Sequence, residues 1–226
     1  MNEPNIIEMS VVVVAEHHNP SILHPAFLKH EKIMPPDLET NSEQSFTTPQ
    51  VSAVSFTNGI RMVIEPNRLQ VVDSQSESGG RETFLQELCK KYVEILPHVN
   101  YKAVGVNITA FHVKKGADQF MIEHFMKERS WDLTESRAKL RTASCKLIYA
   151  MEDFQIGYEF SAGRPDKKNE EDSRTEEVIL IKANFHADID ASTSADRCHR
   201  CVEIIDRICR YKAFFIEMTP QLLLLD

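Results

Sequence analysis

Residues 101–114 read YKAVGVNITAFHVK, and the fold prediction starts from this stretch. Side chains alternate between the two faces of a β-strand. One face of this stretch is therefore aliphatic, formed by Val104, Val106, Ile108 and Ala110. The other face is small and polar, formed by Tyr101, Ala103, Gly105, Asn107 and Thr109. The pattern predicts a long strand in the middle of the chain with one face against the core.

Residues 7–18, IEMSVVVVAEHH, have the same alternating texture near the N-terminus. After each of these strands come a short helix candidate, a group of strands and a long amphipathic helix. The order β-α-β-β-β-α thus occurs twice, in residues 1–98 and 99–226. We expect an α+β fold and a single domain over residues 1–226, whose two halves form one continuous antiparallel sheet with the long helices on one face. This layout resembles the helix-grip folds and the saddle of the TATA-binding protein.

Turn residues and periodicity predict the remaining elements. Asn58-Gly59 favours a tight hairpin turn, and the polar residues 39–49 indicate an exposed loop. We expect further strands at residues 51–57, 60–65, 68–73, 140–150, 154–162 and 178–189. We expect helices at residues 83–96, 118–128 and 195–212 and a charged loop at residues 163–177.

Composition limits the classes of partner. The chain has 226 residues, 42% of them hydrophobic, and its 26 Lys and Arg against 34 Asp and Glu give a formal net charge of −8. This length and composition are typical of a globular protein. Broad binding to DNA or RNA requires a basic surface, so a nucleic-acid partner is not expected.

The sequence predicts a cytoplasmic protein. It contains no run of about 18 apolar residues that could span a membrane. Residues 1–9 lack the basic and apolar regions of a signal peptide. The five cysteines are an odd number and lie mostly at expected core positions, which indicates a reducing compartment.

The most suggestive polar constellation lies on the last expected strand, LIKANFHADID. His186, Asp188 and Asp190 alternate there and share a face with Lys182 and Asn184. A histidine with two carboxylates could bind a divalent metal or act as a base with an orienting acid. The alternative, which we favour, is a solvent-exposed polar strand face. No HExxH motif or second carboxylate cluster supports a metal, so none is predicted.

Cys198 and Cys201 form a CxxC motif near the start of the last helix. A zinc site needs a second ligand pair, which the sequence lacks, whereas a redox CxxC gains reactivity from a helix N-terminus. The two cysteines also fall on an apolar stripe with Ile205 and Ile208, and cysteine packs as a small hydrophobe. We favour core packing.

The last helix also carries a row of arginines. Arg197, Arg200, Arg207 and Arg210 are interleaved with Glu203 and Asp206. The row could contact nucleic acid or an acidic partner, but mixed charge at this spacing is more typical of a solvated helix face.

Three segments resemble a known family. They are residues 19–37 (NPSILHPAFLKHEKIMPPD), 92–107 (YVEILPHVNYKAVGVN) and 184–190 (NFHADID). They resemble a family of uncharacterised bacterial proteins of about this length, sporadically distributed and common in cyanobacteria-like sequences. The resemblance covers most of the chain and implies a single globular unit. It brings no assigned activity, cofactor or catalytic residue.

We interpret the chain as a non-enzymatic binding or adaptor protein that acts through protein–protein contacts, including self-association, without a cofactor. No GxGxxG, GxxxxGK[ST] or GxSxG motif is present. The expected contact residues are Asn107, Thr109, Asn184 and His186 on the open sheet face and Leu222, Leu223, Leu224 and Leu225 in the tail. One alternative is a metal-dependent or small-molecule-processing enzyme using His186, Asp188 and Asp190. A weaker one is nucleic-acid binding by the arginines of the last helix.

Overall fold

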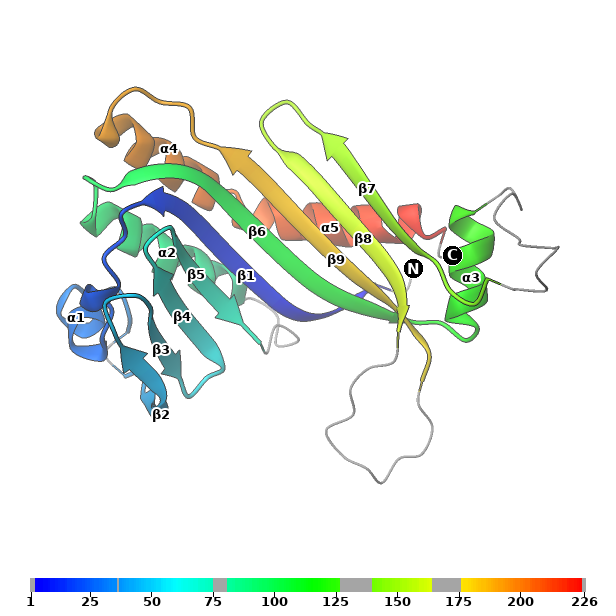
Figure 1. Ribbon diagram of the computed structural model, residues 1–226, viewed down its shortest axis with the longest axis horizontal. Helices are drawn as coiled ribbons and strands as arrows, with labels where there is room; N and C mark the ends of the chain where they lie inside the picture. Colours follow the sequence, from blue (N-terminus) through cyan, green and yellow to red (C-terminus); the bar gives the residue numbers. More distant parts are fainter. Residues whose placement is uncertain (1–2, 36, 75–80, 127–139, 164–175, 225–226) are drawn as a thin grey trace.

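The chain forms a mixed α and β structure around one large antiparallel sheet (Figure 1). The computed structural model describes residues 3–35, 37–74, 81–126, 140–163 and 176–224. Within these residues the sheet has nine strands in the order β2-β3-β4-β5-β1-β6-β9-β8-β7. Their bounds are β1 Asn5–Glu16, β2 Thr40–Thr47, β3 Ser52–Phe56, β4 Ile60–Glu65, β5 Arg68–Asp73, β6 Asn100–Val113, β7 Ser144–Ala150, β8 Gln155–Gly163 and β9 Val178–Asp188.

The helices gather on one face of this sheet. They are η1 Pro20–Ile22, α1 Pro25–His30, α2 Arg81–Ile95, α3 Ala117–Phe125, α4 Ser194–Ile205 and α5 Ile208–Leu222. In Figure 1 helix α5 lies behind the strands, and the Phe185 ring of β9 stacks on Tyr211 of α5 with centroids 5.0 Å apart. Phe125 of α3 likewise stacks on Phe160 of β8. We call the opposite side of the sheet the open face.

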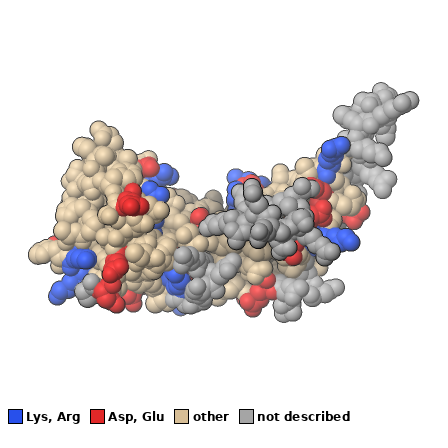
Figure 2. All heavy atoms as spheres, turned by 90° about the horizontal axis from the view of Figure 1, so that it is seen from below, with Lys and Arg blue, Asp and Glu red and all other residues tan. Residues whose placement is uncertain are grey.

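The open face is concave along the length of the molecule. Figure 2 turns this face to the top, and its outline dips between two raised ends. Strand twist accumulates across a sheet of this width, so a curved face is expected.

Strands β1 and β6 pair at the centre of the sheet. On the helix side of each strand the aliphatic residues are buried, as in Val11 opposite Val106. Tyr101 was expected on the open face with Ala103, and this assignment was wrong. Its hydroxyl donates to the Leu96 carbonyl at 3.0 Å, beneath the sheet. The pairing shifts by one residue at Lys102, and such a bulge moves the side chains beyond it to the other face.

Residues 39–49, expected to be a loop, contain strand β2. The strand pairs with β3, from Thr40 opposite Phe56 to Thr47 opposite Ser52, with an irregular register between Asn41 and Phe46. The first half therefore has four strands between its helices where three were expected. A strand at a sheet edge is held by backbone hydrogen bonds and does not need an apolar face. The polar sequence of residues 39–49 therefore gave no sign of a strand.

The last helix was expected at residues 195–212 but is divided into α4 and α5. Helix α5 continues to Leu222, and Pro220 lies in its last turn. Helix α2 of the first half packs beside these helices, with ion pairs between Lys90 and Asp206 at 3.0 Å and between Lys212 and Glu82 at 2.8 Å. The two halves thus share one helix layer. No helix in the described part of the chain has both the length and the apolar character needed to cross a bilayer.

His18, at the end of β1, is buried in this layer. It lies between the rings of Tyr92 and Tyr101, with centroids 5.9 and 6.2 Å away, and its Nδ1 is 3.3 Å from the Tyr92 hydroxyl. Its Nε2 has no hydrogen-bond partner among the described residues. Burial lowers the pKa of His18, because the charged imidazole would lose its hydration.

We expect His18 to make the fold acid-sensitive. The unfolded chain binds a proton at His18 as the pH falls through the ordinary histidine pKa of 6.5, whereas the folded chain binds it only at a lower pH because its pKa is lowered. The free energy of unfolding should therefore decrease below about pH 6.5. The variant His18→Gln should flatten this dependence between about pH 7 and pH 5 in urea titrations. His30→Gln, at a side chain that is 85% exposed, is the matched control, and equal slopes for the two variants would contradict the assignment.

Candidate functional site

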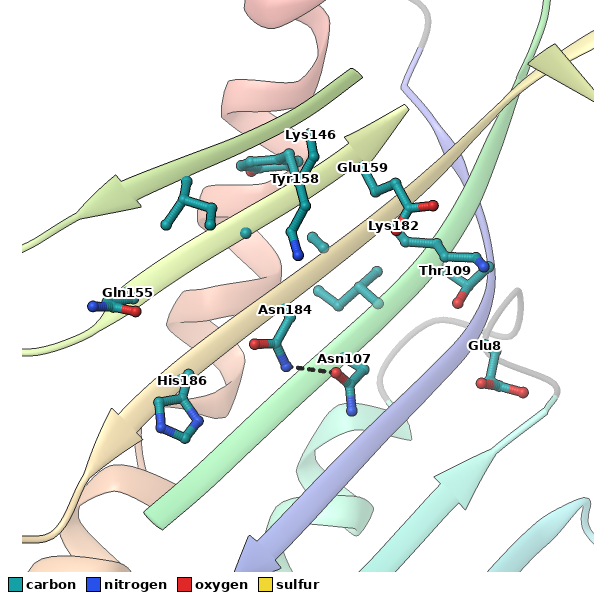
Figure 3. A pocket seen from close by; sticks show the side chains of 14 residues that line it. Glu8, Asn107, Thr109, Lys146, Gln155, Tyr158, Glu159, Lys182, Asn184 and His186 are labelled. Atoms are coloured by element: carbon teal, nitrogen blue, oxygen red, sulfur yellow. Dashed lines mark hydrogen bonds between the residues drawn. The ribbon is translucent and has the colours of Figure 1, made fainter. Parts of the chain in front are cut away.

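A hollow of about 590 Å³ lies on the open face in the second half of the sheet (Figure 3). It extends over β1, β6, β9, β8 and β7. Its polar lining consists of Glu8, Asn107, Thr109, Lys146, Gln155, Glu159, Lys182, Asn184 and His186. Asn107, Thr109, Asn184 and His186 were the open-face residues expected from sequence to make contacts, and the structure brings all four into this hollow.

Cross-strand pairing arranges the lining in rows that run perpendicular to the strands. The first, which we call the charged row, is Lys146, Glu159, Lys182, Thr109 and Glu8, one residue from each of five adjacent strands. Its charges alternate in sign and cancel. None of the salt bridges found among the described residues involves a member of this row. The charged groups are therefore available to a ligand.

The next row along the strands, the amide row, is Ile148, Gly157, Asn184, Asn107 and Ser10. The Asn184 amide donates to Asn107 Oδ1 at 2.7 Å, and the Asn107 amide donates to Ser10 Oγ at 3.2 Å. Ser10 is 2% exposed, so this chain of hydrogen bonds is anchored in the sheet. It fixes the Asn107 side chain and leaves the exposed Asn184 amide at the surface of the hollow (Figure 3).

Gly157 gives the hollow its depth. A Cβ atom built at this position meets no atom within 4 Å. A larger residue on β8 would therefore project into the hollow and fill it without a clash. Glycine in a strand interior often marks a place where another chain or ligand approaches closely.

His186 and Asp188 point to the open face as the alternation predicts. His186 Nε2 lies 3.1 Å from Asp188 Oδ1, and the side chains are 40% and 85% exposed. Asp190 was expected on the same face. Strand β9 ends at Asp188, so Asp190 lies in the connection to α4 and no described contact joins it to the pair. No group of three metal-ligating side chains occurs in the part of the chain that the structure describes.

The CxxC cysteines pack inside the helix layer. Cys201 is fully buried, while Cys198 is half-buried with its thiol 3.6 Å from the Val93 carbonyl. Burial raises the pKa of both thiols, and a raised pKa disfavours the reactive thiolate.

Most arginines of the last helices make contacts within the chain. Arg197 donates to the Tyr101 carbonyl at 3.3 Å, Arg200 pairs with Glu203 at 2.9 Å, and Arg207 pairs with Asp153 at 2.9 Å. Arg210 is exposed. Two of the four arginine charges are thus paired with carboxylates and Arg197 is held by a backbone carbonyl, which reduces the positive charge that the row offers to a polyanion.

The described leucines of the tail, Leu222, Leu223 and Leu224, differ in their exposure. Leu223 is fully buried, and the Leu222 carbonyl lies 2.8 Å from His124 Nε2. Leu224 is 75% exposed, and Leu225 lies outside the described residues. The fold itself buries Leu223, so this residue cannot be a contact for a second chain. Leu223 is buried because α5 continues to Leu222 and places this part of the tail on the helix side of the sheet.

Sequence reasoning missed Lys146, Gln155, Gly157 and Glu159. The alternation of residues 154–162 already placed Gln155, Gly157 and Glu159 opposite Ile156, Tyr158 and Phe160. Nothing in the sequence said that β8 lies beside β9, and this adjacency brings them next to Asn184 and His186.

Comparison with known proteins adds no identification: no protein-family model and no curated protein matches the chain. The resemblance noted for residues 19–37, 92–107 and 184–190 therefore stays a prediction.

We expect no specific metal site at His186. Because the pair is exposed and has no third ligand nearby among the described residues, Zn²⁺, Mn²⁺ or Ni²⁺ should shift the melting temperatures of wild type and His186→Ala equally. Differential scanning fluorimetry with each ion measures this. A stabilisation seen in wild type and lost in the variant would establish a site.

We expect thiol reactivity to follow exposure. Cys209 is exposed, whereas Cys89 and Cys201 are buried with raised pKa values. Iodoacetamide should therefore label Cys209 first in the native protein and leave Cys89 and Cys201 unmodified until denaturant is added. Peptide mass spectrometry reads the order, with urea-unfolded protein as the reference. Faster labelling of Cys198 or Cys201 than of Cys209 would favour the redox interpretation.

Proposed function

We propose that this protein is a non-enzymatic binding protein that holds a short extended segment of another polypeptide in the hollow, lying across β7, β8, β9, β6 and β1. The observation that carries the proposal is the pair of adjacent rows on the hollow's surface, one with alternating and cancelling charges and one that carries the Asn107 and Asn184 amides.

The charges favour a polypeptide over a polyanion. Lys146 and Lys182 are balanced by Glu8 and Glu159 within the same row. Nucleic-acid binding depends on an excess of positive charge that releases counterions from phosphates, and this surface has none. A peptide has an uncharged backbone and can carry side chains of both signs. It suits the charged row better than a nucleic acid does, because each charge of the row can meet an opposite charge of the peptide.

The amides favour a ligand with alternating donors and acceptors. An Asn or Gln side chain carries two N–H donors and a carbonyl acceptor. Asn184 and Gln155 are exposed to the hollow. They can bind the N–H and C=O groups of an extended main chain, which have the same complementary pattern. Tyr158 borders the hollow, but its side chain is only 1% exposed and its ring stacks on Phe215 of α5, so it offers no open aromatic face to a nucleic-acid base.

The dimensions fit a short peptide. Neighbouring strands are about 4.8 Å apart, so five strands span roughly 19 Å. An extended chain advances about 3.3 Å per residue, and about six residues cover this distance. The hollow can therefore hold an extended segment of about six residues.

The architecture proposed with this function is a duplicated saddle. On each side of the β1–β6 pair the strands follow in reverse chain order, β5-β4-β3-β2 and β9-β8-β7, which supports two copies of one unit in residues 1–98 and 99–226. A second hollow of about 420 Å³ lies on the open face of the first half, lined by Arg61, Val63, Gln70 and Val72 of β4 and β5. Its place in the first half corresponds to that of the peptide hollow in the second.

Two other candidate functions have less support: an enzyme that uses His186 and Asp188, and nucleic-acid binding by the arginines of the last helices. The His186–Asp188 pair is exposed, and catalytic acid–base pairs normally work in a site that excludes water. The arginine row has internal partners. A reducing compartment such as the cytoplasm is supported by the five free thiols.

We expect peptides selected from a random twelve-residue display library to bind this hollow. Fluorescence polarisation should show binding to wild type that falls at least tenfold in Gly157→Val, because the valine fills the hollow. Asn184→Ala should also weaken binding, by about fivefold for one lost hydrogen bond.

Gly163→Val is the matched control. Gly163 ends the same strand outside the hollow, and a Cβ atom there meets only Leu180 Cβ at 4.0 Å. Peptide affinity should be unchanged in this variant. Equal affinity for wild type and Gly157→Val, or selected ligands that are displaced by salt in the manner of a polyanion, would rule the proposal out.

A further inference from the structure

Strand β7 forms one edge of the sheet and collects exposed apolar residues. Seven large hydrophobic residues are exposed in the described part of the chain. Four of them, Leu140, Ile148, Tyr149 and Met151, lie in β7 or within four residues of it. Ile148 is 65% exposed. Exposed apolar side chains on an edge strand mark a place where another strand can pair.

The two edges of the sheet differ. Strand β2 at the opposite edge is polar and irregular in register, and both features discourage pairing with another chain. Strand β7 pairs with β8 without a register shift from Ser144 to Ala150. It contains no proline, and Lys146 is its only charged residue. Among the described residues nothing pairs with its outer side.

The backbone groups that face outward can be assigned. The Met151 amide donates to the Phe154 carbonyl at 2.9 Å, so these two form a hydrogen-bonded pair at the turn. Hydrogen-bonded and non-hydrogen-bonded pairs alternate in an antiparallel ladder. The odd-numbered residues of β7 therefore bond to β8. The even-numbered ones, Ser144, Lys146, Ile148 and Ala150, direct their N–H and C=O groups away from the sheet.

We propose that β7 pairs with β7 of a second copy of this chain, antiparallel about a two-fold axis at Leu147. In this register Ser144 faces Ala150 of the second copy and Lys146 faces its Ile148. Every outward N–H and C=O of the strand then gains a partner. The sheet continues from one copy into the other, and the open faces join.

The occupant is a second copy because the edge is complementary to itself in this register. Arg141 precedes β7 and is exposed, and the turn after β7 contains Glu152 and Asp153. The two-fold axis places Arg141 of each copy opposite the acidic turn of the other. It also sets Leu147 against Leu147 and Cys145 against Tyr149, and it brings no two like charges face to face. The pairing does not depend on what the hollow binds.

Sedimentation velocity over a concentration series tests the pairing. Wild type should associate to a dimer. Ile148→Lys should raise the dissociation constant about tenfold, because the lysine introduced at 148 meets Lys146 of the other copy at two symmetry-related places. The double variant Lys146→Glu/Ile148→Lys should restore dimerisation, since it places a glutamate opposite a lysine at both symmetry-related places.

Val113→Lys is the matched control, because Val113 is 47% exposed at the end of β6 and away from the β7 edge. It should dimerise as wild type does. Circular dichroism establishes that each variant is folded. A wild type that stays monomeric at all concentrations overturns the proposal, as does an Ile148→Lys variant that dimerises normally or a double variant that is not rescued. Peptide binding to the hollow is measured separately, through Gly157→Val, so either proposal can fail alone.

Discussion

The backbone ladder between β1 and β6 is the constraint on which the rest of the structure depends. It joins the two halves at the centre of the sheet, and its register decides which side chains meet the helices. Because side chains alternate with a period of two, a slip of one residue between the strands would turn the buried valines of one of them to the open face. Two bulges, at Ile7 and Lys102, adjust the ends of the ladder without disturbing its middle. The open-face position of Asn107 and the buried position of Tyr101 at the start of β6 are both consequences of this single pairing.

Local pattern predicted most of the elements. The alternation in residues 101–114 and 178–189 and the Asn58-Gly59 turn correspond to β6, β9 and the β3–β4 hairpin. The prediction failed where side-chain pattern carries little of the information. Strand β2 is held by backbone pairing at an edge, the bulge at Lys102 reversed the side of Tyr101, and α5 continued through a proline. Tertiary contacts decided each of these cases, and no short window of sequence contains them.

The candidate site could be predicted only in part for the same reason. Asn107, Thr109, Asn184 and His186 were found because each lies on the exposed side of a clearly alternating strand. Lys146, Gly157 and Glu159 join them through the order of strands in the sheet, because β8 pairs with β9 and sets Gly157 and Glu159 beside Asn184 and Lys182, more than twenty positions further along the chain. A single strand can show which face a residue occupies. The rows that give the hollow its alternating charge exist only across strands, and chain topology creates them.

The shared helix layer has a consequence for how the chain could have arisen and how it could be divided. Helix α2 ends the first half, yet its Lys90 and Glu82 pair with Asp206 and Lys212 from the end of the second. Each half covers part of the apolar surface of the other. Dividing the chain near residue 98 would therefore expose apolar surface on both pieces. Separating the two halves would therefore break both the β1–β6 pairing and these ion pairs. Permuted chains with new ends in the surface turns of either half are the rearrangements that keep its core intact.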